Sequence, residues 1–361
     1  MTSRRNFLAG LMSTGLCPVA SWADAGRPSH LAAAQRPDGQ YELTGLDRDG
    51  NRLFQVPLPD RGHAAAAHPL RPEAVAFARR PGAFAVVLDC LSGVERTRLI
   101  APTGHHFYGH GVFSTDGRIL FTTENDFEAG QGMIGVWDAE NEYKRVGAFS
   151  SGGVGPHDIR LMPDGLVLVV ANGGIETHPD TGRAKLNLPV MRPNLTYLGL
   201  SGAILEQVEL SSDQHKNSIR HLAVRADGLV GFALQWQGDG DIFPALVGLH
   251  HREAGALRLL EAPAPSQRRT KGYAGSIAFS GGGDLVGFTA PRGNVLQVFD
   301  VQTGNLVVEH VITDVCGLSS HQAGFRFTSG TGTVGWADRD QVGPLAMHAC
   351  QWDNHLVPVF G

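Results

Sequence analysis

The sequence predicts an all-β protein: a single seven-bladed β-propeller whose ring is closed by pairing of its N- and C-terminal strands. Three observations predict this fold. Gly and Pro together make up nearly a fifth of the 361 residues, which favours many short strands over long helices. Hairpin signals recur along the chain, and the spacing of the recurring unit divides the chain into seven.

The recurring unit opens with a short apolar strand, a tight turn and a second apolar strand. Its turns lie at Asp116-Gly117, Asp164-Gly165, Asp227-Gly228 and Gly282-Gly283, and Asp-Gly between apolar runs is a strong hairpin signal. A second hairpin follows each turn, so the unit has the four strands of a propeller blade. These second hairpins are expected at 133–138 with 143–149, 195–200 with 203–210, 245–249 with 257–262, and 295–300 with 305–311.

Weaker copies of the unit complete the ring. They lie at 63–78 and 316–329, while 31–58 supplies three strands that need an inner partner from the C-terminal residues 355–359. The seven inner strands are then predicted to begin at His63, His110, Asp158, His221, Ser276, Cys316 and His355, about 49 residues apart on average. The pattern resembles the YVTN/WD40-like propeller superfamily. A longer spacing places a polar insert at 173–194, expected over one face.

The N-terminal residues 1–23 resemble a twin-arginine (Tat) signal peptide. Arg4-Arg5 precedes Asn6-Phe7-Leu8 and a moderately apolar run that ends in small residues. We expect cleavage after Ala23 or Ala25, export to the periplasm, and a mature propeller domain over 24–361. Three cysteines remain after cleavage, Cys90, Cys316 and Cys350, which permits one disulfide.

Composition excludes several other classes of protein. The net charge is −5 and no basic cluster interrupts the sequence, so we expect no nucleic-acid groove. No segment reaches the length of about 18 apolar residues that a membrane span needs. We expect a monomer, since ring closure leaves no free sheet edge.

Histidine is the unusual residue, with 16 in the chain. Because the first positions of the inner strands surround one mouth of the channel, histidines there converge, and imidazole binds Zn, Cu or Fe. Such a site should weaken as the pH falls through about 6.5. The alternative is that these histidines are structural and hydrogen-bonded. The metal-ligand candidates are His63, His110, His157, Asp158, His221, Cys316 and His355, of which three or four neighbours would hold one ion.

Loops at the same mouth supply further candidate contacts. Function on a closed β scaffold commonly lies in such loops. The candidates are His105, His106, Tyr108, Glu124, Asn172, Gln235, Lys271, Tyr273 and Arg292.

Over nearly its whole length the chain resembles the domain of unknown function 1513 family. The shared features are the Tat start and two motifs, Tyr108–Ser114 and Gly155–Ile159. The resemblance implies association with imelysin-like periplasmic partners in iron uptake, and it implies no activity. We therefore favour a binding protein that accepts a transition metal or a partner protein.

The alternative is a metal-dependent enzyme, either a lactonase or other hydrolase or an oxidoreductase, that uses the same mouth. In a lactonase, Glu124, Asn172 and Asp158 would coordinate calcium. The histidines fit a softer metal better.

The Tat assignment predicts that replacing Arg4 and Arg5 with Lys leaves the precursor in the cytoplasm. Fractionation and immunoblotting would measure the distribution, with Arg27→Lys as the control. A normal periplasmic yield of the Lys-Lys variant would refute the assignment.

Overall fold

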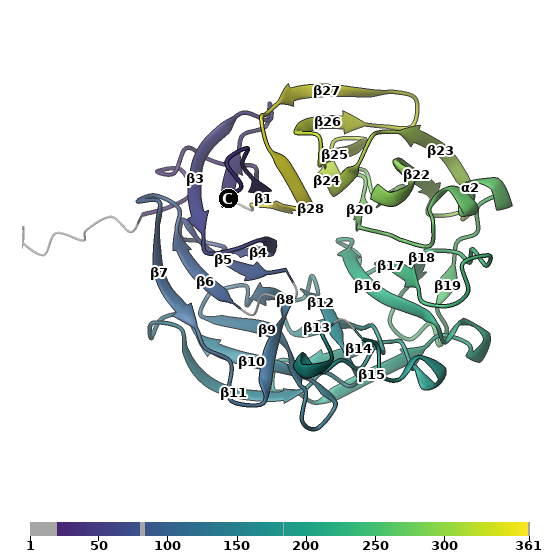
Figure 1. The fold of residues 1–361 in the computed structure, drawn as a ribbon, viewed down its shortest axis with the longest axis horizontal. Helices are drawn as coiled ribbons and strands as arrows, with labels where there is room; N and C mark the ends of the chain where they lie inside the picture. Colours follow the sequence, from purple (N-terminus) through teal and green to yellow (C-terminus); the bar gives the residue numbers. More distant parts are fainter. Residues whose placement is uncertain (1–19, 80–83, 183, 360–361) are drawn as a thin grey trace, which may run out of the picture.

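Seven four-stranded antiparallel sheets surround a central axis, as predicted from the sequence (Figure 1). The computed structural model describes residues 20–79, 84–182 and 184–359. The predicted twin-arginine motif lies outside the described residues. In this part of the chain no helix is both long and apolar enough to cross a membrane.

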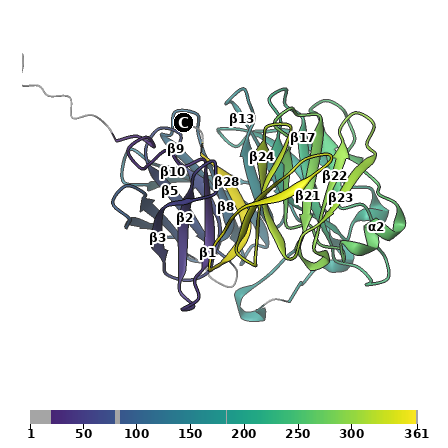
Figure 2. The same cartoon turned by 90° about the horizontal axis from the view of Figure 1, so that it is seen from above.

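Each blade runs from an inner strand at the axis to an outer strand at the rim (Figures 1 and 2). The first four blades are β28(Gln351–Pro358) with β1(His30–Gln35), β2(Tyr41–Leu46) and β3(Arg52–Leu58); β4(Gly62–Ala67), β5(Glu73–Ala78), β6(Ala85–Asp89) and β7(Val94–Leu99); β8(His105–Phe113), β9(Ile119–Asp126), β10(Gln131–Asp138) and β11(Lys144–Ser150); and β12(Pro156–Leu161), β13(Val167–Asn172), β14(Asn194–Gly199) and β15(Ile204–Glu209).

The other three blades follow in the same order around the ring. They are β16(Asn217–Val224), β17(Val230–Trp236), β18(Val247–His250) and β19(Arg258–Leu259); β20(Ser276–Phe279), β21(Leu285–Ala290), β22(Val295–Asp300) and β23(Leu306–Val311); and β24(Val315–His321), β25(Gly324–Ser329), β26(Thr333–Ala337) and β27(Val342–Met347). One short helix, α2(Ala264–Arg269), and four 3-10 turns at Pro179–Thr181, Leu188–Val190, Ser212–Gln214 and Pro291–Gly293 lie in the connections.

The hairpin turns form where glycine allows a left-handed backbone. Gly117 has a φ of +74° and Gly165 a φ of +70°, a region that glycine enters without a steric penalty. A Cβ on Gly117 would also lie 2.4 Å from the His68 ring. Conformation and space therefore both require glycine at this turn between β8 and β9.

The C-terminal strand closes the ring. β28 pairs antiparallel with β1, with Leu31 opposite Val357 and Ala32 opposite Leu356. The side chains of Leu31 and Leu356 are buried, and β28 also contacts the inner strands β4 and β24 on either side. The prediction that the last strand completes the N-terminal blade is confirmed.

The insert at 173–194 lies against the entrance of the third blade. The Asn125 side-chain amide donates to the backbone oxygen of Thr177 (3.1 Å), and the hydroxyls of Tyr108 and Thr177 are 2.9 Å apart. Tyr108 belongs to β8 and Asn125 to β9. The insert is thereby fixed to the face at which the inner strand β8 begins and β9 ends.

Residues just before β1 also pack on the propeller. Trp22 is buried, and its Nε1 donates to the backbone oxygen of His68 (2.7 Å). Cleavage after Ala23, as predicted from the sequence, would remove this contact from the mature chain. Cys90, Cys316 and Cys350 are all buried free thiols.

Ring closure predicts that deleting residues 355–361 lowers the free energy of unfolding by about 3 kcal/mol or more, because β1 loses its pairing with residues 356–358 and the buried side chain of Leu356 is removed. Leu356→Asp should cost a similar amount. Val311→Asp, at an exposed position, is the matched control. Urea unfolding measures all three, and wild-type stability of the truncated chain would contradict the closure.

Candidate metal centre

β-Bulges in the inner strands direct side chains to the axis. Six of the seven inner strands shift register against their neighbour, and only β20 pairs without a shift. Bulges bend a strand and change the direction of its side chains. The residues that the shifts displace include His63, His110, His157, Cys316 and His355, whereas in β16 the shift falls at Arg220, immediately before His221.

Five of the predicted histidines, from five different blades, gather into one cluster. Ring centroids are 4.6 Å apart for His63 and His355, 4.7 Å for His110 and His355, and 4.8 Å for His157 and His221. Four of the rings are buried and His157 is partly buried. Two groups place one ligand atom from each residue within 4.8 Å of the others: His63 with His110 and His355, and His110 with His157 and His221.

Asp158 orients the His110 ring through a contact with its Nδ1 nitrogen. Its Oδ1 lies 3.2 Å from His110 Nδ1 and accepts from the backbone N–H of Ile159, and its Oδ2 accepts from the backbone N–H of Leu222. Burial opposes ionisation of Asp158, but Arg160 and His110 outweigh it and hold the pKa of this carboxyl well below its usual range. A carboxylate behind a histidine fixes the tautomer and orients the ring for a metal. Asp158 is therefore placed to orient His110 and not to bind an ion itself, since neither group of histidines includes it.

The tautomer of His110 determines which nitrogen of His63 can donate a hydrogen bond and which is left without a partner. With Nδ1 donating to Asp158, His110 Nε2 carries a lone pair, and it lies 3.2 Å from His63 Nε2. Without an ion, His63 Nε2 must donate to it, which leaves His63 Nδ1 as a buried acceptor with no partner. Two nitrogens bound tetrahedrally to one Zn²⁺ are about 3.3 Å apart. The observed separation therefore suits a shared ion as well as a hydrogen bond.

Buried ring nitrogens without partners recur through the cluster. Within the described residues, His63 Nδ1, His157 Nε2, both nitrogens of His221 and His355 Nε2 have no hydrogen-bond partner. An unsatisfied buried polar atom costs about 1–3 kcal/mol. No other protein atom in this part of the chain satisfies these nitrogens, so they are open to a ligand, either an ion or water.

His157 is the least suited of the five to hold an ion. Arg220 Nη1 lies 3.2 Å from His157 Nδ1, and because a guanidinium can only donate, Nδ1 must accept. A neutral His157 then carries its proton on Nε2 and offers no lone pair there. Sequence analysis did not single out Arg220, although it lies directly before His221.

Cys316 lies apart from the histidines. Its Sγ donates to the backbone oxygen of Asp314 (2.9 Å), and burial raises the pKa of the thiol. A metal ligand must be a thiolate. The histidine groups found among the described residues do not include Cys316.

Residues that sequence analysis assigned to a calcium-dependent lactonase are held by other partners. Both carboxylate oxygens of Glu124 accept from Arg145 (2.6 and 2.9 Å). The Asn172 side chain bonds to Ser151 and Asn194. These contacts hold both side chains within their own blades.

The remaining candidates form two groups at the mouth. His105 lies 3.7 Å from Glu124, and the ring of His106 stacks on Phe127 with centroids 5.7 Å apart. Tyr108 joins them through its contact with the insert. The second group, in another sector, comprises Gln235, bonded to the backbone oxygen of Ala274, the exposed Lys271, and Arg292 over the Tyr273 ring.

Comparison with known proteins identifies the family. A family model described as "Protein of unknown function (DUF1513)" matches residues 56–359. The chain belongs to the DUF1513 family. No curated protein matches the sequence of this DUF1513 propeller.

Among solved structures, Kuenenia stuttgartiensis hydrazine synthase is similar to the DUF1513 propeller. The TM-score is 0.58 at 16% sequence identity, and the match covers 89% of this chain and 96% of that chain. At this identity the likeness shows the fold alone.

The histidine cluster predicts that the metal-free DUF1513 propeller loses stability on acidification. Burial, and then the neighbouring charges, lower the pKa values of His63, His157, His221 and His355 well below 6.5. Unfolded histidines titrate near 6.5, so below that pH the unfolded chain binds more protons and stability falls. Each such histidine lowers the free energy of unfolding by about 1.4 kcal/mol for each pH unit below 6.5, until the pH reaches its folded-state pKa.

Urea unfolding at pH 7.5, 6.5 and 5.5 would measure this slope. His221→Gln should reduce it, whereas His251→Gln, at an exposed position, should leave it unchanged. Equal slopes in the wild type and His221→Gln would contradict the prediction.

Proposed function

We propose that this DUF1513 propeller binds one transition metal ion in its channel through His63, His110 and His355. The observation that carries the proposal is the convergence of three buried imidazoles from three blades, with ligand atoms within 4.8 Å of one another. His110 is oriented for this role by Asp158. His221, whose ring lies 4.9 Å from that of His355, is the neighbour best able to supply a fourth nitrogen.

The electrostatics of the cluster suit a metal. Burial lowers the pKa values of His63 and His355, so both rings are neutral at pH 7 and their lone pairs are available. The midpoint for loss of metal on acidification should therefore lie below the value of about 6.5 that unperturbed histidines would give. An all-imidazole set binds Zn²⁺, Cu²⁺ or Fe²⁺, and affinity for Cu²⁺ exceeds that for the other two.

We further propose that the protein acts in the periplasm as an accessory to metal or iron acquisition. The Arg4-Arg5 motif supports export through the Tat route, which carries proteins that are already folded, often after insertion of a cofactor. The family resemblance supports an imelysin-like partner. An enzyme is the second hypothesis, but Glu124 and Asn172, two of the three calcium ligands of its lactonase version, are engaged by other side chains of their own blades.

Metal analysis tests the site. Purified protein is dialysed separately against Zn²⁺, Cu²⁺ and Fe²⁺ and then desalted, and bound metal is measured by mass spectrometry. We expect about one equivalent of at least one metal in the wild type. The double variant His63→Ala/His355→Ala should retain less than a tenth of that amount, and His251→Ala should match the wild type.

Asp158→Asn separates orientation from ligation. It keeps the histidines but replaces the carboxylate behind His110, so metal affinity should fall about 10–100-fold while the stoichiometry at saturation stays at one. Competition with a chromogenic chelator measures the affinity, and circular dichroism checks the fold. Metal-free wild-type protein after all three dialyses, or full metal content in the double variant, would refute the site.

A further inference from the structure

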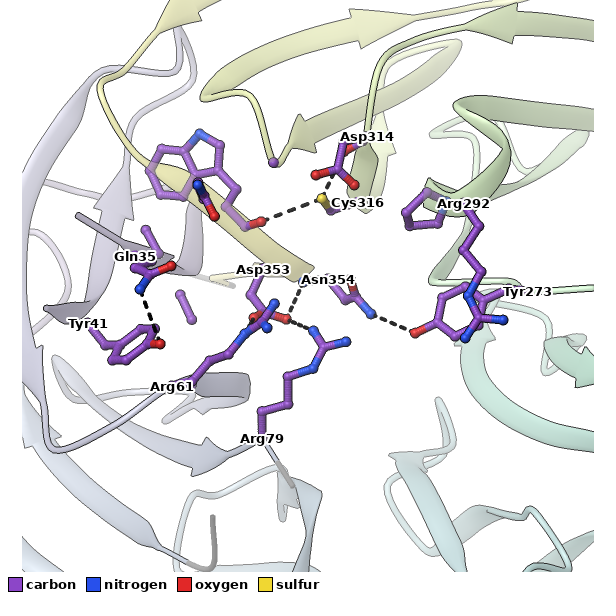
Figure 3. Close-up of a pocket in the computed structure, with 17 residues that line it drawn as sticks. Gln35, Tyr41, Arg61, Arg79, Tyr273, Arg292, Asp314, Cys316, Asp353 and Asn354 are labelled. Carbon is purple, nitrogen blue, oxygen red and sulfur yellow. Dashed lines mark hydrogen bonds and ion pairs between the residues drawn. The ribbon is translucent and has the colours of Figure 1, made fainter. Parts of the chain in front are cut away.

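A second feature lies at the mouth, among the N-terminal blade, the blade that follows it and the two blades that precede it in the ring. A pocket of about 230 Å³ is lined by residues of these four blades and of their connecting loops (Figure 3). A cavity of this volume has room for a small organic molecule.

Arginines dominate the polar wall of the pocket. Arg61, Arg79 and Arg292 line it together with two carboxylates, Asp353 and Asp314. Asp353 is buried and engages two of the arginines, with Arg61 Nε and Arg79 Nη1 each 2.6 Å from its oxygens. One carboxylate thus holds two guanidinium groups at the pocket wall, and it fixes their positions.

Arg292 carries a charge that no described carboxylate pairs with. Its guanidinium lies over the Tyr273 ring, 4.3 Å from the centroid, and the Tyr273 hydroxyl accepts from the side-chain amide of Asn354 (3.2 Å). Figure 3 shows Arg292 beside Tyr273, and Arg79 beside Asp353. A stacked guanidinium keeps its edge free for a planar, bidentate carboxylate contact.

The pocket lining also includes apolar groups. Ala33 and Ala34 contribute methyl groups to it. Cationic groups together with methyl groups match an organic anion better than an inorganic one.

We infer that this pocket binds a small dicarboxylate, with one carboxylate on Arg292 and the other on Arg79, and its carbon chain against Ala33 and Ala34. The site is distinct from the histidine cluster and needs no metal. The pocket adjoins the histidine cluster. Two of its lining residues, Gly62 and Asn354, directly precede His63 and His355 in the sequence. A bound dicarboxylate would therefore lie over the entrance to the histidines from this side.

Isothermal titration of succinate into EDTA-treated, metal-free protein tests the inference. We expect saturable binding of one equivalent. Arg292→Gln, at an exposed position that leaves the fold intact, should weaken it at least tenfold. Arg98→Gln, which removes the same charge from the outer strand β7, should stay within twofold of the wild type.

Two further probes define the ligand class. Succinamide, which has the same shape without charge, should not bind, and inorganic phosphate should bind at least tenfold more weakly than succinate. Absence of saturable succinate binding, equal binding of phosphate, or equal weakening by Arg98→Gln would each overturn the inference. Because the protein is metal-free throughout, these results are independent of the outcome of the metal analysis.

Discussion

The pairing of β28 with β1 is the constraint on which the rest of the structure depends. It joins the two ends of the chain, so every blade has a neighbouring blade on both sides and β1 has a paired strand on each of its edges. The same strand carries Asp353, Asn354 and His355. The strand that closes the ring therefore also supplies residues of the channel. A chain with an open ring would lack His355 in the histidine cluster, and Asp353 and Asn354 in the mouth pocket.

The sequence was sufficient to predict the blades because their signals are local. An Asp-Gly turn such as Asp116-Gly117 specifies its hairpin through residues adjacent in the sequence, because glycine allows the left-handed backbone that the turn needs. Four strong copies of the four-stranded unit then fixed the spacing from which the weaker ones were found. The last strand followed from counting, since residues 31–58 supply three strands and a propeller blade needs four.

The candidate site was predicted less completely, because bulges depend on pairing between strands. A register shift at His157 explains why the repeat placed Asp158, and not His157, at the position that histidine occupies in the neighbouring blades. The shift directs the imidazole toward the other histidines and turns the carboxylate toward His110 Nδ1 and the backbone of Leu222. Arg61 and Asp353 were not predicted at all, although each lies two residues before a clustered histidine.

The three cysteines have a consequence for where the protein can fold. Cys90, Cys316 and Cys350 are separately buried, and burial raises the pKa of each thiol, so none is a ready nucleophile for disulfide exchange. No covalent cross-link among them supports the described ring. The same native state is therefore accessible in a reducing cytoplasm and in an oxidising compartment, without help from a thiol oxidase or an isomerase.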